Sequence, residues 1–245
     1  MKNLILKALT FIKRILTIFF EKVMPDKEPI EFIKGYSSMY NRYREEEAES
    51  CYQEFKKYFK DAVFLSSYAE IINFSLKEVE KSDSKNEKLY LEFGVFKGYT
   101  ANLISKKIDK LYAFDSFEGL RDTWGGGLKS KEHFDLKGII PKMNNNVIPI
   151  KGYVQDTLKD FLKDKSEIIF VHMDLDTYDS TKFVLENIKP YLANGAVIIF
   201  GQIYNYPGWK YGEYKALKEV FVDRDYKFIA FSQFSKYGVI KFLSK

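Results

Sequence analysis

The sequence predicts an α/β fold: a Rossmann-like, doubly wound, mostly parallel seven-stranded sheet with an antiparallel C-terminal hairpin strand. Two observations lead to this prediction. From residue 89 onward, short apolar runs alternate with helical patterns, which is the order expected for strands and helices in a parallel sheet. Two further apolar runs, 228–234 and 237–243, follow one another closely and fit a hairpin at the end of the chain.

The first strand–turn–helix–strand unit is expected at residues 89–115. Gly94 and Gly98 follow the first apolar run and permit a tight turn that a ligand can approach closely. Thr100 opens a helix whose first N–H groups are free to bind a ligand. The second strand ends at Asp115, where a carboxylate can accept hydrogen bonds from the hydroxyl groups of a ribose.

The spacing of this turn narrows the choice of ligand. The pattern is not G-x-G-x-x-G, so the dinucleotide fingerprint is incomplete. Glu92, inside the turn, would repel a pyrophosphate and suits a cation or an amine. Asp115 can accept hydrogen bonds from a ribose, and the carboxylate of Glu92 suits a ligand with a cationic tail. The nucleoside that best fits both residues is S-adenosyl-L-methionine, which we therefore expect as the cofactor. A strand–turn–helix with a purely structural role is the alternative.

The remaining elements of the sheet follow in order. Aromatic and aliphatic residues between 52 and 76 recur at helical spacing, and the glycine-rich stretch 120–146 is expected to be an active-site flap. Further strands are expected at 147–150, 168–171 and 196–200, with a loop at 152–156 and helices from Thr157, at 178–192 and at 214–221.

Three parts are expected along the chain: a basic amphipathic helix at 1–24, a helical extension at 25–87 and a catalytic domain at 88–245. Basic residues interrupt the apolar pattern of the first part, so no run reaches the about 18 residues needed to span a bilayer. This helix can lie on an anionic membrane surface, or pack on its own domain or on a second subunit of a homodimer. The sequence leaves these alternatives open.

The composition limits the classes of partner. The chain has 46% hydrophobic and 17% aromatic residues, enough to build a core. Its net charge of +5 is mild and no basic–aromatic patch is present, so nucleic acid is not an expected partner. Cys51 is the only cysteine, which excludes an internal disulfide and a cysteine-based zinc site and favours the cytoplasm as location.

A second group of polar residues follows the apolar run 168–171. In an extended backbone His172, Asp174 and Asp176 lie on one face. Because ligands of open α/β sheets bind beyond the carboxyl ends of the strands, Asp174 is expected near the ligand. There it can take a proton from a substrate hydroxyl or hold a divalent cation. Asp179 is expected to cap the next helix, and His172 to be a core histidine.

With these motifs the sequence resembles the class I S-adenosyl-L-methionine-dependent methyltransferases. Within them it is similar to the macrocin O-methyltransferase family, which methylates sugar hydroxyls in macrolide and aminocoumarin antibiotics. The resemblance covers more than half of the chain. The matching segments are Glu92–Gly98, Phe114–Gly119, Gly152–Leu158, Asp174–Thr181 and Asn205–Trp209.

The resemblance implies a set of site residues. The glycines would line the methionine end of the cofactor, Asp115 would hold the ribose, and Gln155 with Asp156 would lie near the adenine. Asp174 falls on the catalytic aspartate of the family, which is also a Mg²⁺ ligand. The cofactor-binding residues implied are Glu92, Gly94, Phe96, Lys97, Gly98, Tyr99, Thr100, Asp115, Ser116, Gln155 and Asp156.

The metal site departs from the family pattern. The family supplies two adjacent acidic residues after the fifth strand, where this sequence has Gly201 and Gln202. Without those carboxylates a hard cation loses most of its charge neutralisation, so tight Mg²⁺ binding is not expected. Three outcomes stay open: metal-free transfer with Asp174 as base, a rearranged metal site using Asp176, or a lost activity.

The expected function is therefore O-methylation of a small molecule or glycan. The acceptor would be a hydroxyl on a sugar, a cell-surface polysaccharide precursor or a natural product. Tyr204, Tyr206 and Trp209 either stack on a sugar ring or pack within their loop. The alternative function is a catalytically impaired scaffold or binding module in a glycan-assembly complex.

Overall fold

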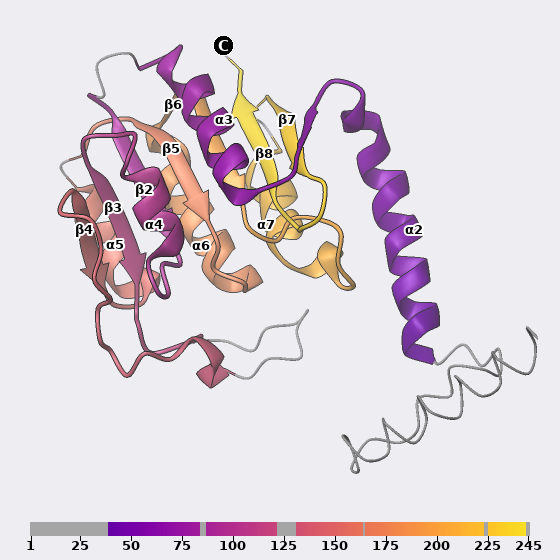
Figure 1. The fold of residues 1–245 in the computed structure, drawn as a ribbon, viewed down its shortest axis with the longest axis horizontal. Helices are drawn as coiled ribbons and strands as arrows, with labels where there is room; N and C mark the ends of the chain where they lie inside the picture. The colour runs from indigo at the N-terminus through magenta and orange to yellow at the C-terminus, as the bar shows by residue number, and fades with distance from the viewer. Residues whose placement is uncertain (1–38, 84–86, 122–130, 164, 223–224, 244–245) are drawn as a thin grey trace, which may run out of the picture. The chain divides into compact units, whose positions relative to one another are not determined.

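A computed structural model describes residues 39–83, 87–121, 131–163, 165–222 and 225–243 (Figure 1). The chain separates into two compact units, 1–42 and 43–245, and the second contains the sheet. The expected amphipathic helix at 1–24 and the glycine run of the expected flap lie outside the described residues. The expected domain boundaries stay predictions. Within the described ranges, no helix is long and apolar enough to cross a bilayer.

The core of the fold is an eight-stranded sheet with the strand order β1-β7-β8-β6-β5-β2-β3-β4. All neighbouring strands are parallel except β8, which is antiparallel to β6 and to β7. The strands are β1 Val63–Leu65, β2 Leu89–Phe93, β3 Leu111–Asp115, β4 Val147–Lys151, β5 Ile168–Met173, β6 Leu192–Phe200, β7 Tyr226–Ser232 and β8 Gly238–Phe242. The predicted fold class and the closing hairpin are confirmed, although the sheet has eight strands where seven were expected.

The additional strand is β1, which pairs in parallel with β7 at the edge of the sheet. Its three residues lie within the stretch predicted as helical, between α2 (Met39–Phe59) and α3 (Tyr68–Glu80). Such a short run carries no detectable period of two, and its pairing with β7 is a long-range contact. The local pattern of aromatic residues therefore hides it.

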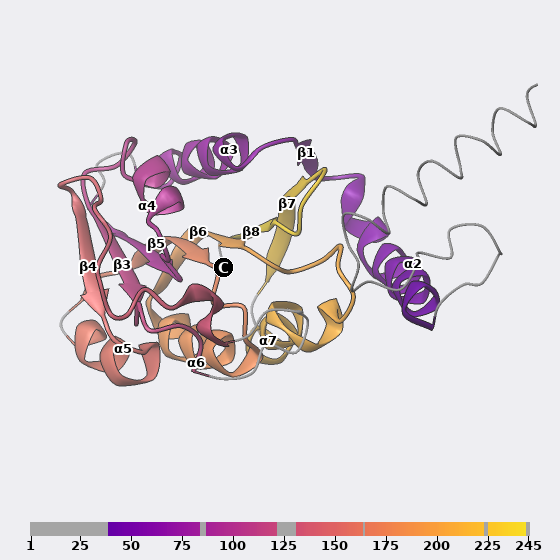
Figure 2. The same ribbon diagram turned by 60° about the horizontal axis from the view of Figure 1, so that its bottom comes forward.

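Helices cover both faces of the sheet (Figure 2). α3 and α4 (Tyr99–Ile104) lie on one face, whereas α5 (Val154–Leu162), α6 (Tyr178–Ile188) and α7 (Glu213–Val220) lie on the other. Short 3₁₀ turns occur at Lys131–Phe134, Lys189–Tyr191 and Trp209–Tyr211. Because both faces are covered, a central strand such as β5 is buried at all six positions and is apolar almost throughout.

Several element boundaries differ from prediction. α5 begins at Val154 rather than at Thr157, so the expected loop at 152–156 is shorter. α6 ends at Ile188, since Pro190 follows in a 3₁₀ turn, and β6 begins at Leu192 rather than at Ala196. These shifts move no strand end that faces the site described below.

The topology creates a crevice between β2 and β5. From β2 the chain proceeds outward through β3 and β4, whereas β5 leads to β6 on the other side. The hydrogen-bond ladder continues past the strands, because the Asp174 amide donates to the Phe93 carbonyl (2.8 Å) and the Gly94 amide to the Phe114 carbonyl (3.0 Å). The segments that follow β2 and β5 therefore meet at the point where open α/β sheets bind ligands.

Candidate active site

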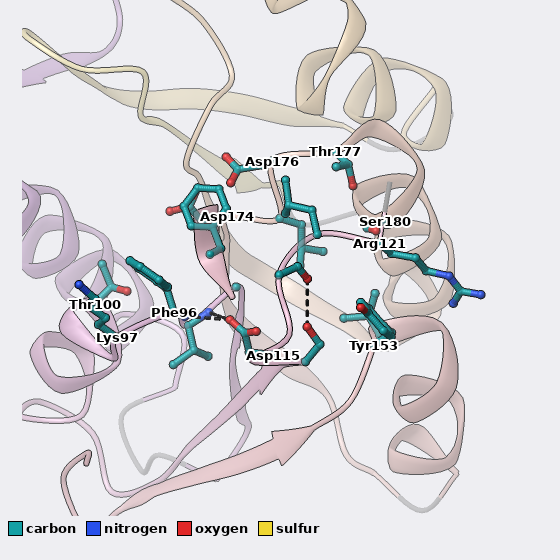
Figure 3. Close-up of a pocket in the computed structure, with 18 of the residues that line it drawn as sticks. Phe96, Lys97, Thr100, Asp115, Arg121, Tyr153, Asp174, Asp176, Thr177 and Ser180 are labelled. Atoms are coloured by element: carbon teal, nitrogen blue, oxygen red, sulfur yellow. Dashed lines mark hydrogen bonds between the residues drawn. The ribbon is translucent and has the colours of Figure 1, made fainter. Parts of the chain in front are cut away.

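A cavity of about 350 Å³ opens at the carboxyl ends of β2, β3 and β5 (Figure 3). Three of the cofactor-binding residues implied by the resemblance do not line it: Glu92, Gly98 and Asp156. The predicted residues that line it are Gly94, Phe96, Lys97, Tyr99, Thr100, Asp115, Ser116, Gln155, Asp174 and Asp176. Gly201 and Gln202, at the expected metal positions, lie outside the lining.

The turn after β2 is held by Asp115. Its Oδ2 accepts hydrogen bonds from the amides of Val95 and Phe96, both at 2.8 Å (Figure 3). Its Oδ1 accepts one from the amide of Phe117 at 2.7 Å. A carboxylate has about four acceptor positions, so one is left for a ligand hydroxyl. Phe96 (φ 48°) and Phe117 (φ 58°) adopt left-handed conformations, each at a cost of about 1–3 kcal/mol. Asp115 thus fixes a strained, preformed turn.

The two glycines of this turn have different roles. Gly94 has φ +87°, and a Cβ there would lie 2.0 Å from the carbonyl oxygen of Asp174. Gly94 is therefore required where the turn crosses the segment after β5. Gly98 (φ +77°) precedes α4, and a Cβ there would meet Met143 at 2.8 Å. Gly98 shapes the packing behind the cavity instead of its wall.

Glu92 lies behind the cavity wall. Its side chain is fully buried, and its Oε1 is 3.0 Å from Nδ1 of His172 and accepts a hydrogen bond from Oγ1 of Thr100 at 2.5 Å. Burial disfavours the charged imidazolium, but the hydrogen bond and charge of Glu92, with the charge of Asp174, raise the pKa of His172. The carboxylate expected to face a cationic ligand is thus bound to His172, and it orients Thr100, which does line the cavity.

Asp174 directly follows β5 and lines the cavity. It is half-buried, and the hydroxyl of Tyr237 donates to its Oδ2 at 3.4 Å. Burial raises the pKa of this carboxyl group, and the charge of His172 acts in the opposite direction. A raised pKa makes Asp174 a stronger base than an exposed aspartate.

Gly201 and Gln202 lie beside Asp174. A Cβ at Gly201 would be 2.1 Å from Oδ1 of Asp174, so the carboxylate already occupies the space of a side chain at position 201. Gln202 is held by two hydrogen bonds. Its side-chain Oε1 accepts from Nζ of Lys236 at 3.2 Å, and its backbone amide donates to Oε2 of Glu213 at 2.7 Å.

Glu213 is a buried carboxyl group that the sequence did not reveal. Only 1% of the residue is exposed, and its Oε1 has no hydrogen-bond partner within the described part of the chain. Burial, reinforced by the charge of Asp174, raises its pKa well above the usual range. In the sequence it resembles an ordinary first-turn glutamate of α7, and no local signal distinguishes it.

These residues do not form a Mg²⁺ site. No group of three or more His, Cys, Asp or Glu side chains in the described ranges is arranged to hold a metal ion. The side-chain space at Gly201 is filled by Asp174, and the amide oxygen of Gln202 already binds an ammonium group. Asp176 lines the cavity in a left-handed conformation (φ 62°), and the rearranged site considered for it is not formed.

The far end of the cavity is built by α5 and α6. Nε2 of Gln155 donates to Oγ of Ser180 at 3.1 Å, and Oε1 of Gln155 is buried without a hydrogen-bond partner among the residues described. Arg121 lies over the ring of Tyr153 at 5.7 Å and 3.9 Å from the carboxylate of Asp156. Asp156 therefore contributes to this end through Arg121. Further wall residues that the sequence did not indicate are Tyr68, Tyr153, Thr177, Ser180 and Tyr237.

Two aromatic residues expected after the fifth strand are packed in the core. Tyr204 is 7% and Trp209 is 3% exposed, and their ring centroids lie 5.6 and 5.4 Å from that of Phe55 in α2. The packing alternative therefore holds for both. Tyr206 is half-buried, and Nζ of Lys236 lies 4.8 Å from its ring centroid.

Comparison with known proteins gives a family match over part of the chain and several solved structures of similar fold. Residues 91–203 match a family described as a methyltransferase domain. The chain is similar to the crystal structure of CalS11, a calicheamicin methyltransferase, with 17% identity and a TM-score of 0.55 over 88% of this chain and 97% of that chain. It is also similar to the O-methyltransferase NovP, with 20% identity and a TM-score of 0.56 over 72% and 79% of the two chains.

An apo structure of CalS11, described as a TDP-rhamnose 3'-O-methyltransferase, has 22% identity and a TM-score of 0.52 over 71% of this chain and 78% of that chain. A search of curated proteins gave no match. At these identities the structural likenesses establish the fold. The family match over residues 91–203 agrees with the methyltransferase resemblance expected from the sequence motifs.

Proposed function

From the match of residues 91–203 to a methyltransferase domain, we propose that the chain is a class I, S-adenosyl-L-methionine-dependent methyltransferase and that it methylates a hydroxyl group of a sugar. One observation carries the proposal: a carboxylate of raised pKa, Asp174, lies on the cavity wall where the segment after β5 crosses the glycine turn. A sugar acceptor is supported by CalS11, which is described as a TDP-rhamnose 3'-O-methyltransferase, and transfer to oxygen is supported by CalS11 and NovP.

The cavity fits the cofactor through features of its own residues. The preformed turn at Gly94 brings backbone into the wall, and Asp115 retains one acceptor position for a ribose hydroxyl. The buried Oε1 of Gln155 is a spare acceptor for the amino group of an adenine. When bound, the cofactor supplies an electrophilic methyl group on a sulfonium centre.

The chain's own contribution is to orient the acceptor and remove its proton. Asp174 takes the proton of the sugar hydroxyl, and Tyr237 holds the carboxylate in place through its hydrogen bond. Thr100, oriented by Glu92, shapes the wall on the other side. Alignment of donor and acceptor is the larger part of the task for an in-line displacement.

The test uses the full chain and has two stages. Calorimetry with S-adenosylhomocysteine measures cofactor binding, and mass spectrometry then measures methylation of nucleotide-linked deoxysugars such as TDP-rhamnose. We expect binding and the addition of one methyl group to oxygen. Absence of binding would contradict the cofactor assignment. Binding together with N- or C-methylation of the acceptors would contradict the proposed O-specificity.

A further inference from the structure

Asp174 and Asp176, which follow β5, line the cavity on the side where the acceptor would bind. Behind that wall lie Glu213, in the first turn of α7, and Lys236, in the turn between β7 and β8, joined through Gln202. Building on the proposed function, we propose that Lys236 supplies positive charge behind Asp174, in place of a divalent cation. Gln202 holds its ammonium group there.

The position of Lys236 is fixed by contacts at both ends of the residue. Its carbonyl oxygen accepts a hydrogen bond from the amide of Ile203 at 3.0 Å, which ties the β7–β8 turn to the segment after β6. Its Nζ donates to Oε1 of Gln202 at 3.2 Å and lies 4.8 Å from the ring centroid of Tyr206. The long side chain is thus directed toward the strand end that carries Gly201 and Gln202.

The ammonium group is linked to the carboxylates on either side. Gln202 accepts from Lys236 through its side chain and donates to Glu213 through its amide. The next residue, Tyr237, donates to Asp174. One lysine therefore shares a hydrogen-bonded network with Glu213, and its chain neighbour extends that network to Asp174.

A divalent cation and this lysine would compete for the same place. The amide oxygen of Gln202 is the only side-chain oxygen that positions 201 and 202 offer, and it already accepts from Nζ of Lys236. A cation bound there would face the ammonium charge at close range, where like charges repel strongly in a partly buried setting. The carboxylate of Asp174 also fills the side-chain space at Gly201, so an acidic residue there would displace it.

Lys236 is a positioning residue in this account. It acts on the acceptor through Asp174 and Gln202, because a nearby positive charge stabilises the negative charge that the reacting hydroxyl develops as it loses its proton. No redox step or further reactant is involved. The proton moves from the sugar oxygen to Asp174, and the lysine keeps its own.

The first test measures metal binding directly and needs no acceptor. Mn²⁺ is titrated by calorimetry into the full-length protein, with and without S-adenosylhomocysteine. We expect no saturable Mn²⁺ binding at micromolar concentrations. Binding of one Mn²⁺ per chain at those concentrations would overturn the proposal. Because S-adenosylhomocysteine binding is measured in the same experiment, failure of the proposed function is distinguished from failure of this inference.

The second test replaces the lysine and uses the acceptor that the sugar screen identifies. We expect Lys236→Met to lower kcat at least tenfold while the Kd for S-adenosylhomocysteine changes less than twofold. Lys236→Arg should restore most of the activity, and chelation by EDTA should leave the wild type unchanged. Lys227→Met, on the exposed side of β7, is the matched control and should behave as the wild type. An unchanged kcat in Lys236→Met, or loss of wild-type activity with EDTA and its recovery with Mg²⁺, would overturn the proposal.

Discussion

The two sides of the cavity are built in different ways. On the cofactor side, a nearly continuous segment from β2 into α4 is held by hydrogen bonds from backbone amides to one carboxylate, Asp115. On the acceptor side, side chains from separate segments meet: Asp174 after β5, Gln202 after β6, Glu213 in α7 and Tyr237 before β8.

This difference separates the part of the site that tolerates little change from the part that tolerates more. A turn fixed by backbone geometry tolerates little change, because a single Cβ at Gly94 would collide with another backbone segment. In a cluster of side chains, one residue can be exchanged for another without moving the strands, as we propose for Gly201 and Lys236 in place of a metal site. The predictions below test this contrast from the largest expected effect to the smallest.

Gly94→Ala should damage the cofactor side most severely. An alanine at φ +87° costs about 1–2 kcal/mol, and its Cβ would also lie 2.0 Å from a carbonyl oxygen, which forces β2 and β5 apart. We expect the variant to lose measurable S-adenosylhomocysteine binding and to unfold at lower temperature. Calorimetry and thermal unfolding monitored by circular dichroism measure the two effects.

Gly201→Ala is the matched comparison on the acceptor side. Its Cβ would meet a side-chain carboxylate, which can rotate away, rather than backbone. Folding and S-adenosylhomocysteine binding should persist while methyl transfer falls. Equal loss of stability in the two alanine variants would contradict the contrast between the two sides.

Asp174→Asn should abolish most of the turnover and leave the cofactor side intact. Removal of a general base typically costs about 10²- to 10⁴-fold in rate. Single-turnover methylation assays measure the loss, and calorimetry should give a nearly unchanged Kd for S-adenosylhomocysteine. Asp179→Asn, an exposed aspartate in the first turn of α6, is the control. Full turnover in Asp174→Asn would remove this residue from the mechanism.

Asp115→Asn should weaken the turn without destroying it. The substitution replaces a charged acceptor of backbone hydrogen bonds by a neutral amide, at a cost of about 1.5–3 kcal/mol. We expect at least tenfold weaker S-adenosylhomocysteine binding and lower stability in urea. If affinity and stability both matched the wild type, the preformed turn would not depend on this carboxylate.

The pH dependence of stability should reveal the buried pair of Glu92 and His172, which lies behind the cavity wall. Glu92, Asp174 and Tyr237 face the imidazole of His172, and its pKa in the folded protein is raised above 6.5. The stabilisation is fully present below pH 6.5 and is lost as pH rises through the raised pKa. Urea unfolding between pH 6 and 9 should show this decline, and His172→Gln should flatten it. An equally steep decline in the variant would assign the effect to other groups.

Most of the fold follows from patterns local in sequence. The strands at 89–93 and 111–115, the turn between β2 and α4, and the closing hairpin all carry their own signals: apolar runs of strand length, glycines at fixed spacing and a short polar break. The same locality explains why Asp115 and Asp174 were placed at strand ends from the sequence, because the residue after a buried strand lies at its carboxyl edge.

The acceptor side could not be derived in this way. Glu213 and Lys236 look like solvated charges in the sequence, and only the packing of α7 and of the β7–β8 turn brings them to Gln202. Glu92 was assigned to the ligand because its partner, His172, is distant in sequence and paired across adjacent strands. Each missed or misplaced role rests on a contact between elements that no periodicity encodes.

The ring of Phe55 gives the N-terminal extension a consequence for catalysis. It sits among Tyr204, Trp209 and Phe231, and nearby Glu47 binds the amide of Gly208 at 3.1 Å. α2 therefore packs against the loop that follows β6, just beyond Gln202. A protein trimmed to residue 88 onward would keep its central parallel strands but would lose the contacts of Phe55 and Glu47 that hold this loop in place. A shortened version of the protein should therefore start before α2.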